Sequence, residues 1–276
     1  MTETSETAPA EEFLETQEYR RFAEFCDACR RYRYIGLCYG TPGVGKTLSA
    51  RHYAQWDLVG PALQAQWSHD PGEPPAAIAN CRTLLYTPSM TVTPRRLTDE
   101  VSLLQRALKF TVARARRQDE DELVMNIPTL PERTELLIVD EADRLKFPTL
   151  EQLRDEYDRR GFGLVLIGMP GLERRLARYA QFYSRVGFVH QFRTLSSDGL
   201  RLILAHKWAQ LGLTLNPEDV TDAEAIGAIL RITSGNFRLI QRLFSQIERI
   251  VEINGLRTIT PDAVDAARQS LVIGTA

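Results

Sequence analysis

The chain has 276 residues, which is enough for one α/β domain followed by a smaller second domain. Hydrophobic residues make up 43% and charged residues 25% of it, a composition typical of globular proteins that excludes collagen-like and disulfide-scaffold chains. The formal net charge is −2, so any contact with nucleic acid has to use a local basic surface.

Neither a membrane span nor a signal peptide is visible in the sequence. No apolar run is long enough to cross a bilayer, and the first twelve residues are acidic and polar. We therefore expect a cytoplasmic protein with no membrane partner. Cys26 and Cys29 form a lone C-x-x-C motif, and no second pair has zinc spacing. Buried thiols and a redox pair both remain open for these two residues.

In chain order, strands and helices alternate through the first two thirds of the sequence. Residues 1–10 have few apolar side chains and are expected to be a disordered tail. Short apolar runs predict strands at 34–39, 82–87, 136–140, 164–168 and 187–192. Helical spacing predicts helices at 11–31, 47–56, 149–160 and 172–183, and one that begins at Pro94. The proline-rich stretch 58–80 is expected to be a loop or an irregular insertion.

This alternation predicts a parallel sheet flanked by helices, in an α/β domain that spans residues 11–195. The strand signal then stops. Glycines separate four predicted helices at 196–211, 222–234, 237–254 and 261–271. We therefore expect a small all-helical second domain over residues 196–276.

The loop after the first predicted strand matches G-x-x-x-x-G-K-[ST] in full, and a predicted helix follows it. Backbone N–H groups of such a loop surround phosphate oxygens, and the positive end of the helix dipole faces them. The Lys is expected to reach the β- and γ-phosphates of ATP, and the Thr to bind Mg²⁺. The loop residues are Gly40, Thr41, Pro42, Gly43, Val44, Gly45, Lys46 and Thr47. Leu48, the next residue, is also assigned to the nucleotide site.

A second acidic element ends the third predicted strand, where LLIV runs into Asp140 and Glu141. Asp140 is expected to hold the Mg²⁺ ion and Glu141 to act as the general base on the attacking water. Residues 140–143 also spell the DEAD box of helicases. That interpretation is set aside because such helicases need two domains of this kind.

The stretch LIVDEADRLKFPTLEQLRDEYDRRGFGLVLIGMPGL, at 137–172, resembles AAA+ ATPases of the TnsC, TniB and Mu B group of transposition regulators. The segments FLETQEYRRF and YGTPGVGKT are also similar to this group, and the resemblance covers 13–271. It implies a P-loop AAA+ core with a helical lid, and an ATPase that is slow and stimulated by DNA or a partner.

The resemblance also implies three further site positions. Met169 occupies the sensor 1 position, where the family usually has a polar residue, and this departure implies slow hydrolysis. Arg185, in a Ser-Arg pair, resembles the family's arginine finger, for which Arg174, Arg175 and Arg178 compete. Arg238, in SGNFR, resembles the sensor 2 arginine of the lid.

A locally basic region follows the second predicted strand, where related ATPases face a central channel. We expect it to contact the phosphates of duplex DNA without reading bases; a solvated helix face is the alternative. The candidate DNA-binding residues are Arg95, Arg96, Lys109 and Arg114, with Arg106, Arg116 and Arg117 nearby.

The favoured function is a transposition regulator that oligomerises on duplex DNA with ATP and Mg²⁺, as a ring or a filament. It would recruit or activate a transposase, with a possible target-selector protein, and hydrolysis would disassemble it. Two alternatives stay open: a replication initiator or clamp-loader-like ATPase, and a secretion or signalling ATPase. Initiators usually carry a winged helix after the lid, and the sequence is expected to lack one.

Overall fold

The computed structural model describes residues 13–68, 72–116 and 132–271. Five strands form one sheet in the order β2-β3-β4-β1-β5, and every neighbouring pair is parallel. The strands are β1 (Ile35–Tyr39), β2 (Thr83–Tyr86), β3 (Leu136–Val139), β4 (Gly163–Gly168) and β5 (Val186–Gln191). The predicted parallel α/β sheet is therefore confirmed. The predicted tail at 1–10 lies outside the described residues.

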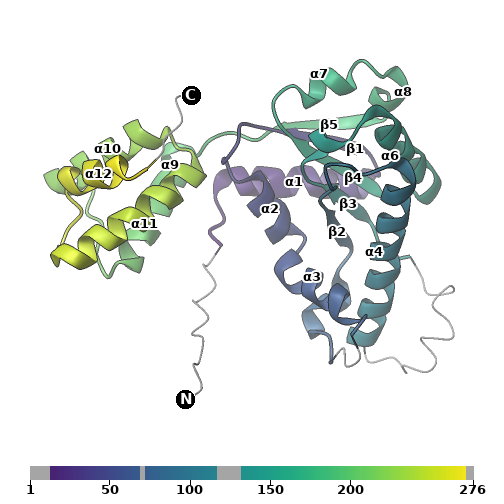
Figure 1. Cartoon of the computed structure of the whole chain (residues 1–276), viewed down its shortest axis with the longest axis horizontal. Coiled ribbons are helices and arrows are strands. Elements are labelled where there is room, and N and C mark those ends of the chain that lie inside the picture. The colour runs from purple at the N-terminus through teal and green to yellow at the C-terminus, as the bar shows by residue number, and fades with distance from the viewer. Residues whose placement is uncertain (1–12, 69–71, 117–131, 272–276) are drawn as a thin grey trace.

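Helices cover both faces of the sheet, so this part of the molecule has three layers (Figure 1). Side chains alternate along each strand: Leu137 and Val139 of β3 enter one core cluster, and Ile138 enters the other. One face packs on α1 (Gln17–Tyr32) and α2 (Lys46–Tyr53). The other packs on α3 (Trp56–Ala65), η1 (Ala76–Asn80), α4 (Pro94–Ala115), α6 (Phe147–Arg160), α7 (Leu172–Leu176) and α8 (Ala180–Tyr183).

Three predictions about the helices were wrong. The first helix was expected at 11–31 but begins only at Gln17, because residues 13–16 are not helical and Thr16 caps the helix. The proline-rich stretch was expected to be a loop or an irregular insertion, but it contains α3, with Pro61 inside the helix. Val59 and Leu63 of α3 are buried in the sheet core, and this apolar face outweighs the backbone N–H that proline lacks. The single helix expected at 172–183 is instead two short helices, α7 and α8.

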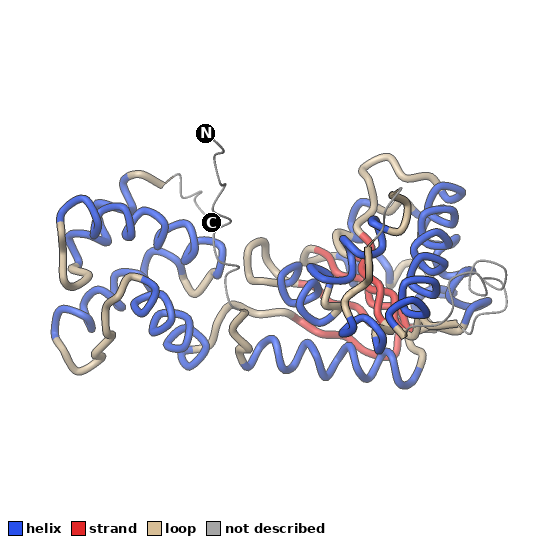
Figure 2. Tube along the Cα trace, turned by 90° about the horizontal axis from the view of Figure 1, so that it is seen from below, coloured by secondary structure: helices blue, strands red, loops and turns tan. Residues whose placement is uncertain are grey.

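Beyond β5 the described chain is helical, and this part is called the lid below (Figure 2). Each lid helix follows a residue whose side chain accepts a hydrogen bond from the first turn, which fixes where the helix begins. These capping residues are Ser196, Asp219, Asn236 and Thr260, and the helices are α9 (Ser197–Gln210), α10 (Val220–Thr233), α11 (Phe237–Asn254) and α12 (Pro261–Gln269).

A short segment before α1, residues 13–16, touches both parts of the molecule; we call it the strap. The Phe13 ring stacks on the His52 ring of α2, with centroids 3.7 Å apart. The next side chain, Leu14, packs against the hydrophobic cluster of the lid. Thr16 then caps α1 by accepting a hydrogen bond from the Tyr19 N–H. The strap therefore links the sheet core to the lid through two adjacent side chains.

The four cysteines are free and buried. Burial raises the pKa of the Cys29 thiol to about 12, and it raises the pKa of Cys26 well above its usual value. Both residues lie in the cluster that α1 forms with the sheet. No helix in the described residues is long and apolar enough to cross a membrane.

Candidate functional site

The loop at residues 40–47, called the phosphate loop, turns sharply between β1 and α2. Its shape depends on glycine: Gly43 and Gly45 have φ angles of 80° and 107°, in the left-handed region that other residues rarely adopt. A Cβ at Gly43 would also lie 2.6 Å from the Asn236 side-chain oxygen. The loop is thus closely packed against the start of the lid helix α11.

Lys46 begins α2 and folds its side chain back over the loop. Its Nζ donates to the backbone oxygens of Gly40 at 2.5 Å and Thr41 at 2.9 Å. Burial lowers the pKa of Lys46, and the nearby Asp140 and Asp143 carboxylates partly oppose that shift. The ammonium group therefore lies at the centre of the loop, as its predicted phosphate-binding role requires.

Thr47 and Asp140 meet although β1 and β3 are not neighbours in the sheet. The Thr47 hydroxyl donates to Asp140 Oδ2 at 2.7 Å, and Asp140 Oδ1 accepts from the Glu141 N–H at 2.9 Å. These are the hard oxygen donors that Mg²⁺ prefers. No group of three or more His, Cys, Asp or Glu side chains among the described residues could hold a metal ion. The donor set thus fits an ion that also uses substrate phosphates and water.

Glu141 adopts a left-handed backbone conformation, with φ of 52°, directly after β3. Its carboxylate forms an ion pair with Arg144, one helical turn further on. Arg144 also donates to the Pro88 backbone oxygen at 2.9 Å, in the loop between β2 and α4. The predicted general base is therefore at the phosphate loop but engaged by an arginine of its own chain.

The lid supplies the far wall of this cleft. The Arg238 N–H donates to the Gly43 backbone oxygen at 2.9 Å, and the Asn236 side-chain amide donates to the Pro42 oxygen at 2.8 Å. The Arg238 side chain lines the same pocket as Lys46. We call this pocket the phosphate cleft; its lining includes Gly43, Gly45, Lys46, Thr47, Leu48, Asp140, Glu141, Asp143, Gly168, Met169, Phe237, Arg238 and Gln241.

The phosphate cleft brings together most of the residues that the sequence assigned to the nucleotide, including Met169 at the end of β4. It also contains Asp143, which the sequence analysis passed over. Asp143 Oδ2 accepts a hydrogen bond from the Met169 N–H at 2.7 Å. The contact joins residues 26 apart in the chain, and no local pattern predicts it.

Arg185 does not line the phosphate cleft. Its Nε lies 2.7 Å from Asp158 Oδ1, and its Nη1 donates to the Gln181 backbone oxygen at 2.5 Å. The guanidinium is one-third exposed, on the side of the molecule where α6 and α8 meet β5. The role of Arg185 on the ATP of a neighbouring subunit stays a prediction.

The four predicted DNA-binding residues all lie on α4 but do not form one patch. Arg95 and Arg96 are exposed at its first turn, where Arg96 pairs with Glu100. Lys109, much further along, pairs with Glu132 and has a side chain that is only 17% exposed. The Arg114 guanidinium donates to the Gly72 backbone oxygen and lies over the Phe110 ring. Arg117 lies outside the described residues.

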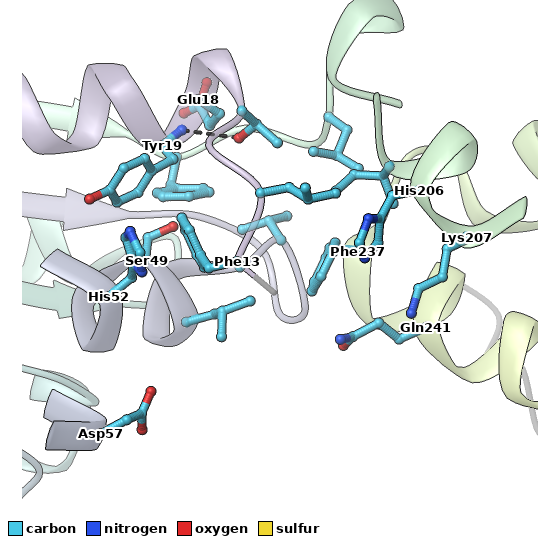
Figure 3. A pocket seen from close by; sticks show the side chains of 18 residues that line it. Phe13, Glu18, Tyr19, Ser49, His52, Asp57, His206, Lys207, Phe237 and Gln241 are labelled. Carbon is cyan, nitrogen blue, oxygen red and sulfur yellow. Dashed lines mark hydrogen bonds between the residues drawn. The ribbon is translucent and has the colours of Figure 1, made fainter. Parts of the chain in front are cut away.

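A second pocket adjoins the phosphate cleft, and the sequence analysis did not predict it (Figure 3). Aromatic rings line it from both sides: Phe13, Tyr19 and His52 from the sheet core, and His206 and Phe237 from the lid. We call it the aromatic pocket. Its lining shares Gly45, Leu48, Phe237 and Gln241 with the phosphate cleft, so the two pockets lie next to each other. The sequence analysis placed Phe13 inside the helix predicted at 11–31, and no sequence signal pointed to a pocket there.

Comparisons with known proteins agree with this arrangement. A "potential ATP-binding protein" of Staphylococcus aureus is 45% identical over 266 residues, covering 95% of this chain and 97% of the relative. The DNA transposition protein B of a Mu-like prophage in Haemophilus influenzae is 28% identical over 248 residues, covering 86% of this chain and 72% of the relative.

Among solved structures, the RuvB Holliday junction branch migration motor of Thermotoga maritima superposes with a TM-score of 0.58. The two sequences are 17% identical, and the match covers 95% of this chain and 71% of RuvB, so it shows a shared fold. The model of the AAA domain family matches residues 29–176, a stretch that contains the phosphate loop, Asp140 and Met169. The chain therefore belongs to the AAA domain family and has the P-loop AAA+ fold.

Proposed function

We propose that the chain binds ATP with Mg²⁺ and hydrolyses it at the phosphate cleft. The observation that carries this proposal is the 2.7 Å contact between the Thr47 hydroxyl and Asp140, beside the Lys46 ammonium. A hydroxyl, a carboxylate and an ammonium group that converge on a glycine loop form a site for a metal-bound triphosphate.

Each residue has a role that follows from its position. Backbone N–H groups of the phosphate loop and Lys46 would bind phosphate oxygens, and Thr47 with Asp140 would hold Mg²⁺. When bound, the ion neutralises charge that develops on the phosphate oxygens. Glu141 would take the proton of the attacking water once its carboxylate leaves Arg144. Because that ion pair must open first, we expect slow basal hydrolysis.

The aromatic pocket gives the nucleoside a place next to the phosphates. It joins the phosphate cleft at Leu48, which lines both. Aromatic rings on both walls offer flat apolar surfaces of the kind that stack on a purine. We propose that adenine lies here, between the strap and α11. A bound nucleotide would thus contact the sheet core and the lid together, and could set the angle between them.

We further propose that the protein acts in DNA transposition, with duplex DNA and a transposase as partners. Support comes from the similarity to a prophage protein described as DNA transposition protein B. The exposed arginines at the start of α4, Arg95 and Arg96, offer sites for DNA phosphates. Arg96 would share its charge with Glu100, and Lys109 and Arg114 would contribute only if their contacts within the chain opened.

Assembly into a ring or filament on DNA is part of this proposal. One subunit offers few phosphate contacts, and repetition along the DNA multiplies them. Arg185 does not line its own cleft and would complete the cleft of a neighbouring subunit. A target-selector protein is a further expected partner.

Three measurements test the proposal in order. Calorimetry should show ATP binding to the wild-type protein and a large loss of affinity for Lys46→Ala. Glu141→Gln should keep its affinity and lose turnover. Electron microscopy with duplex DNA and a slowly hydrolysed ATP analogue should then show rings or filaments. Undiminished ATP affinity of Lys46→Ala would contradict the site. DNA-bound assemblies that never retain a transposase would favour the alternative of a replication initiator or clamp-loader-like ATPase.

A further inference from the structure

We infer that Asp143 is a positioning residue for hydrolysis: from the turn after β3, its carboxylate anchors the backbone at the end of β4, where Met169 lines the phosphate cleft. The inference rests on the proposed ATPase function and names a further residue of the same site. It starts from the departure at position 169: a methionine that is 41% exposed and lines the phosphate cleft without an N–H or O–H donor in its side chain.

The structure places the Asp143 carboxylate at the same point of the cleft. Asp143 Oδ2 accepts from the Met169 N–H at 2.7 Å, so it anchors the backbone where β4 ends. Asp143 itself lines the phosphate cleft together with Asp140 and Glu141. A hydrogen bond to an ionised acceptor is among the stronger ones in proteins, which suits it to hold a strand end in place.

Gly168 makes room for this contact. A Cβ at Gly168 would lie 2.5 Å from Asp143 Oδ2 and 2.8 Å from a methyl carbon of Leu172, although this residue has no unusual φ angle. Glycine is therefore required here by the approach of the carboxylate and not by backbone conformation. Gly168, at the end of β4, and Asp143, the last residue of the DEAD sequence, therefore depend on each other in the structure.

The anchored strand end also touches the phosphate loop. The Gly168 backbone oxygen accepts from the Gly40 N–H at 3.4 Å, and the Lys46 ammonium donates to the Gly40 oxygen at 2.5 Å. A continuous path of contacts thus runs from Asp143 through Gly168 and Met169 to Gly40 and Lys46. Loss of the first contact would let the end of β4 move relative to the phosphate loop.

A second residue holds the turn itself. The Arg175 side chain, from α7, donates to the backbone oxygens of Asp143 at 3.0 Å and of Leu145. The backbone that carries Asp140, Glu141 and Asp143 is therefore fixed at one end by β3 and at the other by Arg175. Through its hydrogen bond to the Met169 N–H, Asp143 holds the end of β4 against this fixed turn, next to the place where the reacting phosphate would lie.

The test compares Asp143→Ala with Asp143→Asn. The asparagine side-chain oxygen can still accept from the Met169 N–H, whereas alanine cannot. We expect kcat for ATP to fall ten- to about a hundredfold in Asp143→Ala, the scale of a misplaced reacting group, with KM and ATP affinity nearly unchanged. Asp143→Asn should restore most of the loss. Glu173→Ala is the matched control, since Glu173 accepts from the Gly171 N–H at 2.9 Å outside the cleft.

Each outcome decides one point. An unchanged kcat in Asp143→Ala would overturn the inference. Equal damage in Asn and Ala variants would also overturn it, because the negative charge would then matter and not the anchoring. Lost ATP affinity or a lowered melting temperature in Asp143→Ala, with kcat unaffected once corrected for folded protein, would show a merely structural role. If the wild-type protein bound ATP but never hydrolysed it, the proposed function would fail first and separately.

Discussion

Asn236 in the lid donates a hydrogen bond from its side-chain amide to the Pro42 backbone oxygen of the phosphate loop, at 2.8 Å. The same side chain caps α11, because its oxygen accepts from the Leu239 N–H at 3.3 Å. One asparagine thus fixes both the start of a lid helix and its distance from the loop that would hold phosphate. Together with the Arg238 N–H, which donates to the Gly43 backbone oxygen, this side chain ties the lid to the phosphate loop.

Asn236→Ala should weaken ATP binding as well as the lid. The loss of a helix cap alone costs about 1 kcal/mol of stability. The additional loss of the Pro42 contact should lower ATP affinity severalfold, because only the Arg238 N–H then ties the phosphate loop to α11. Calorimetry with ATP and thermal unfolding measure the two effects. Thr260→Ala is the control: it removes the cap of α12, away from the cleft, and should lower stability only.

Arg185→Ala should abolish most of the turnover without loss of ATP binding. Its guanidinium is predicted to act on the cleft of a neighbouring subunit, where it would stabilise charge in the transition state. Mixing Arg185→Ala with Lys46→Ala should restore activity, since each variant supplies what the other lacks. Turnover assays across the mixing ratio measure this. Arg174→Ala, a competing arginine that is highly exposed, should behave as wild type. No recovery in the mixture would speak against action between subunits.

Arg95→Ala should weaken binding to duplex DNA equally for all sequences. If Arg95 contacts one phosphate, its removal lowers the slope of log affinity against log salt by about 1. Fluorescence anisotropy over a range of salt concentrations gives both quantities. Arg257→Ala, an exposed arginine in the lid, serves as the charge-matched control. A slope that stays at the wild-type value would remove Arg95 from the DNA surface.

The native protein should react very slowly with thiol reagents at pH 8. The pKa of Cys29 is raised to about 12, so its thiolate fraction at pH 8 is far below that of an unfolded chain. The thiolate is the reactive form, and reactivity should therefore appear only as the protein unfolds or as the pH rises towards that pKa. The absorbance of the thiolate that an aromatic disulfide reagent releases measures the rate at which the cysteine thiols react. Fast reaction in the folded state would revive the redox interpretation of Cys26 and Cys29.

Much of the fold could be predicted because the signals were local. Each strand is a short apolar run, and β3 shows why: its four residues are buried on both faces and need no polar side chains. The helix that begins at Pro94 was also predictable, from its proline and its apolar spacing. The boundary between residues 195 and 196 stays a prediction.

The remaining features depend on contacts between distant segments. Pro61 argued for a loop, and only the sheet against which Val59 and Leu63 pack makes a helix favourable there. The aromatic pocket combines Phe13 with Phe237, from opposite ends of the chain. Asp143 was noted only as part of a helicase-like motif, because the Met169 N–H that it binds lies just beyond β4, 26 residues further along the chain. Such pairings follow from strand order, which apolar runs do not encode.

The strap has a practical consequence for anyone who divides this protein. Leu14 belongs to the hydrophobic cluster of the lid although it precedes the first helix of the sheet core. A recombinant lid fragment that starts at Ser196 would expose the apolar surface against which Leu14 packs. A sheet-core fragment that ends at Leu195 would leave Leu14 without that surface. An affinity tag fused close to residue 13 would disturb the contacts of Phe13 and Leu14 with the sheet core and the lid, so a long spacer should separate the tag from the strap.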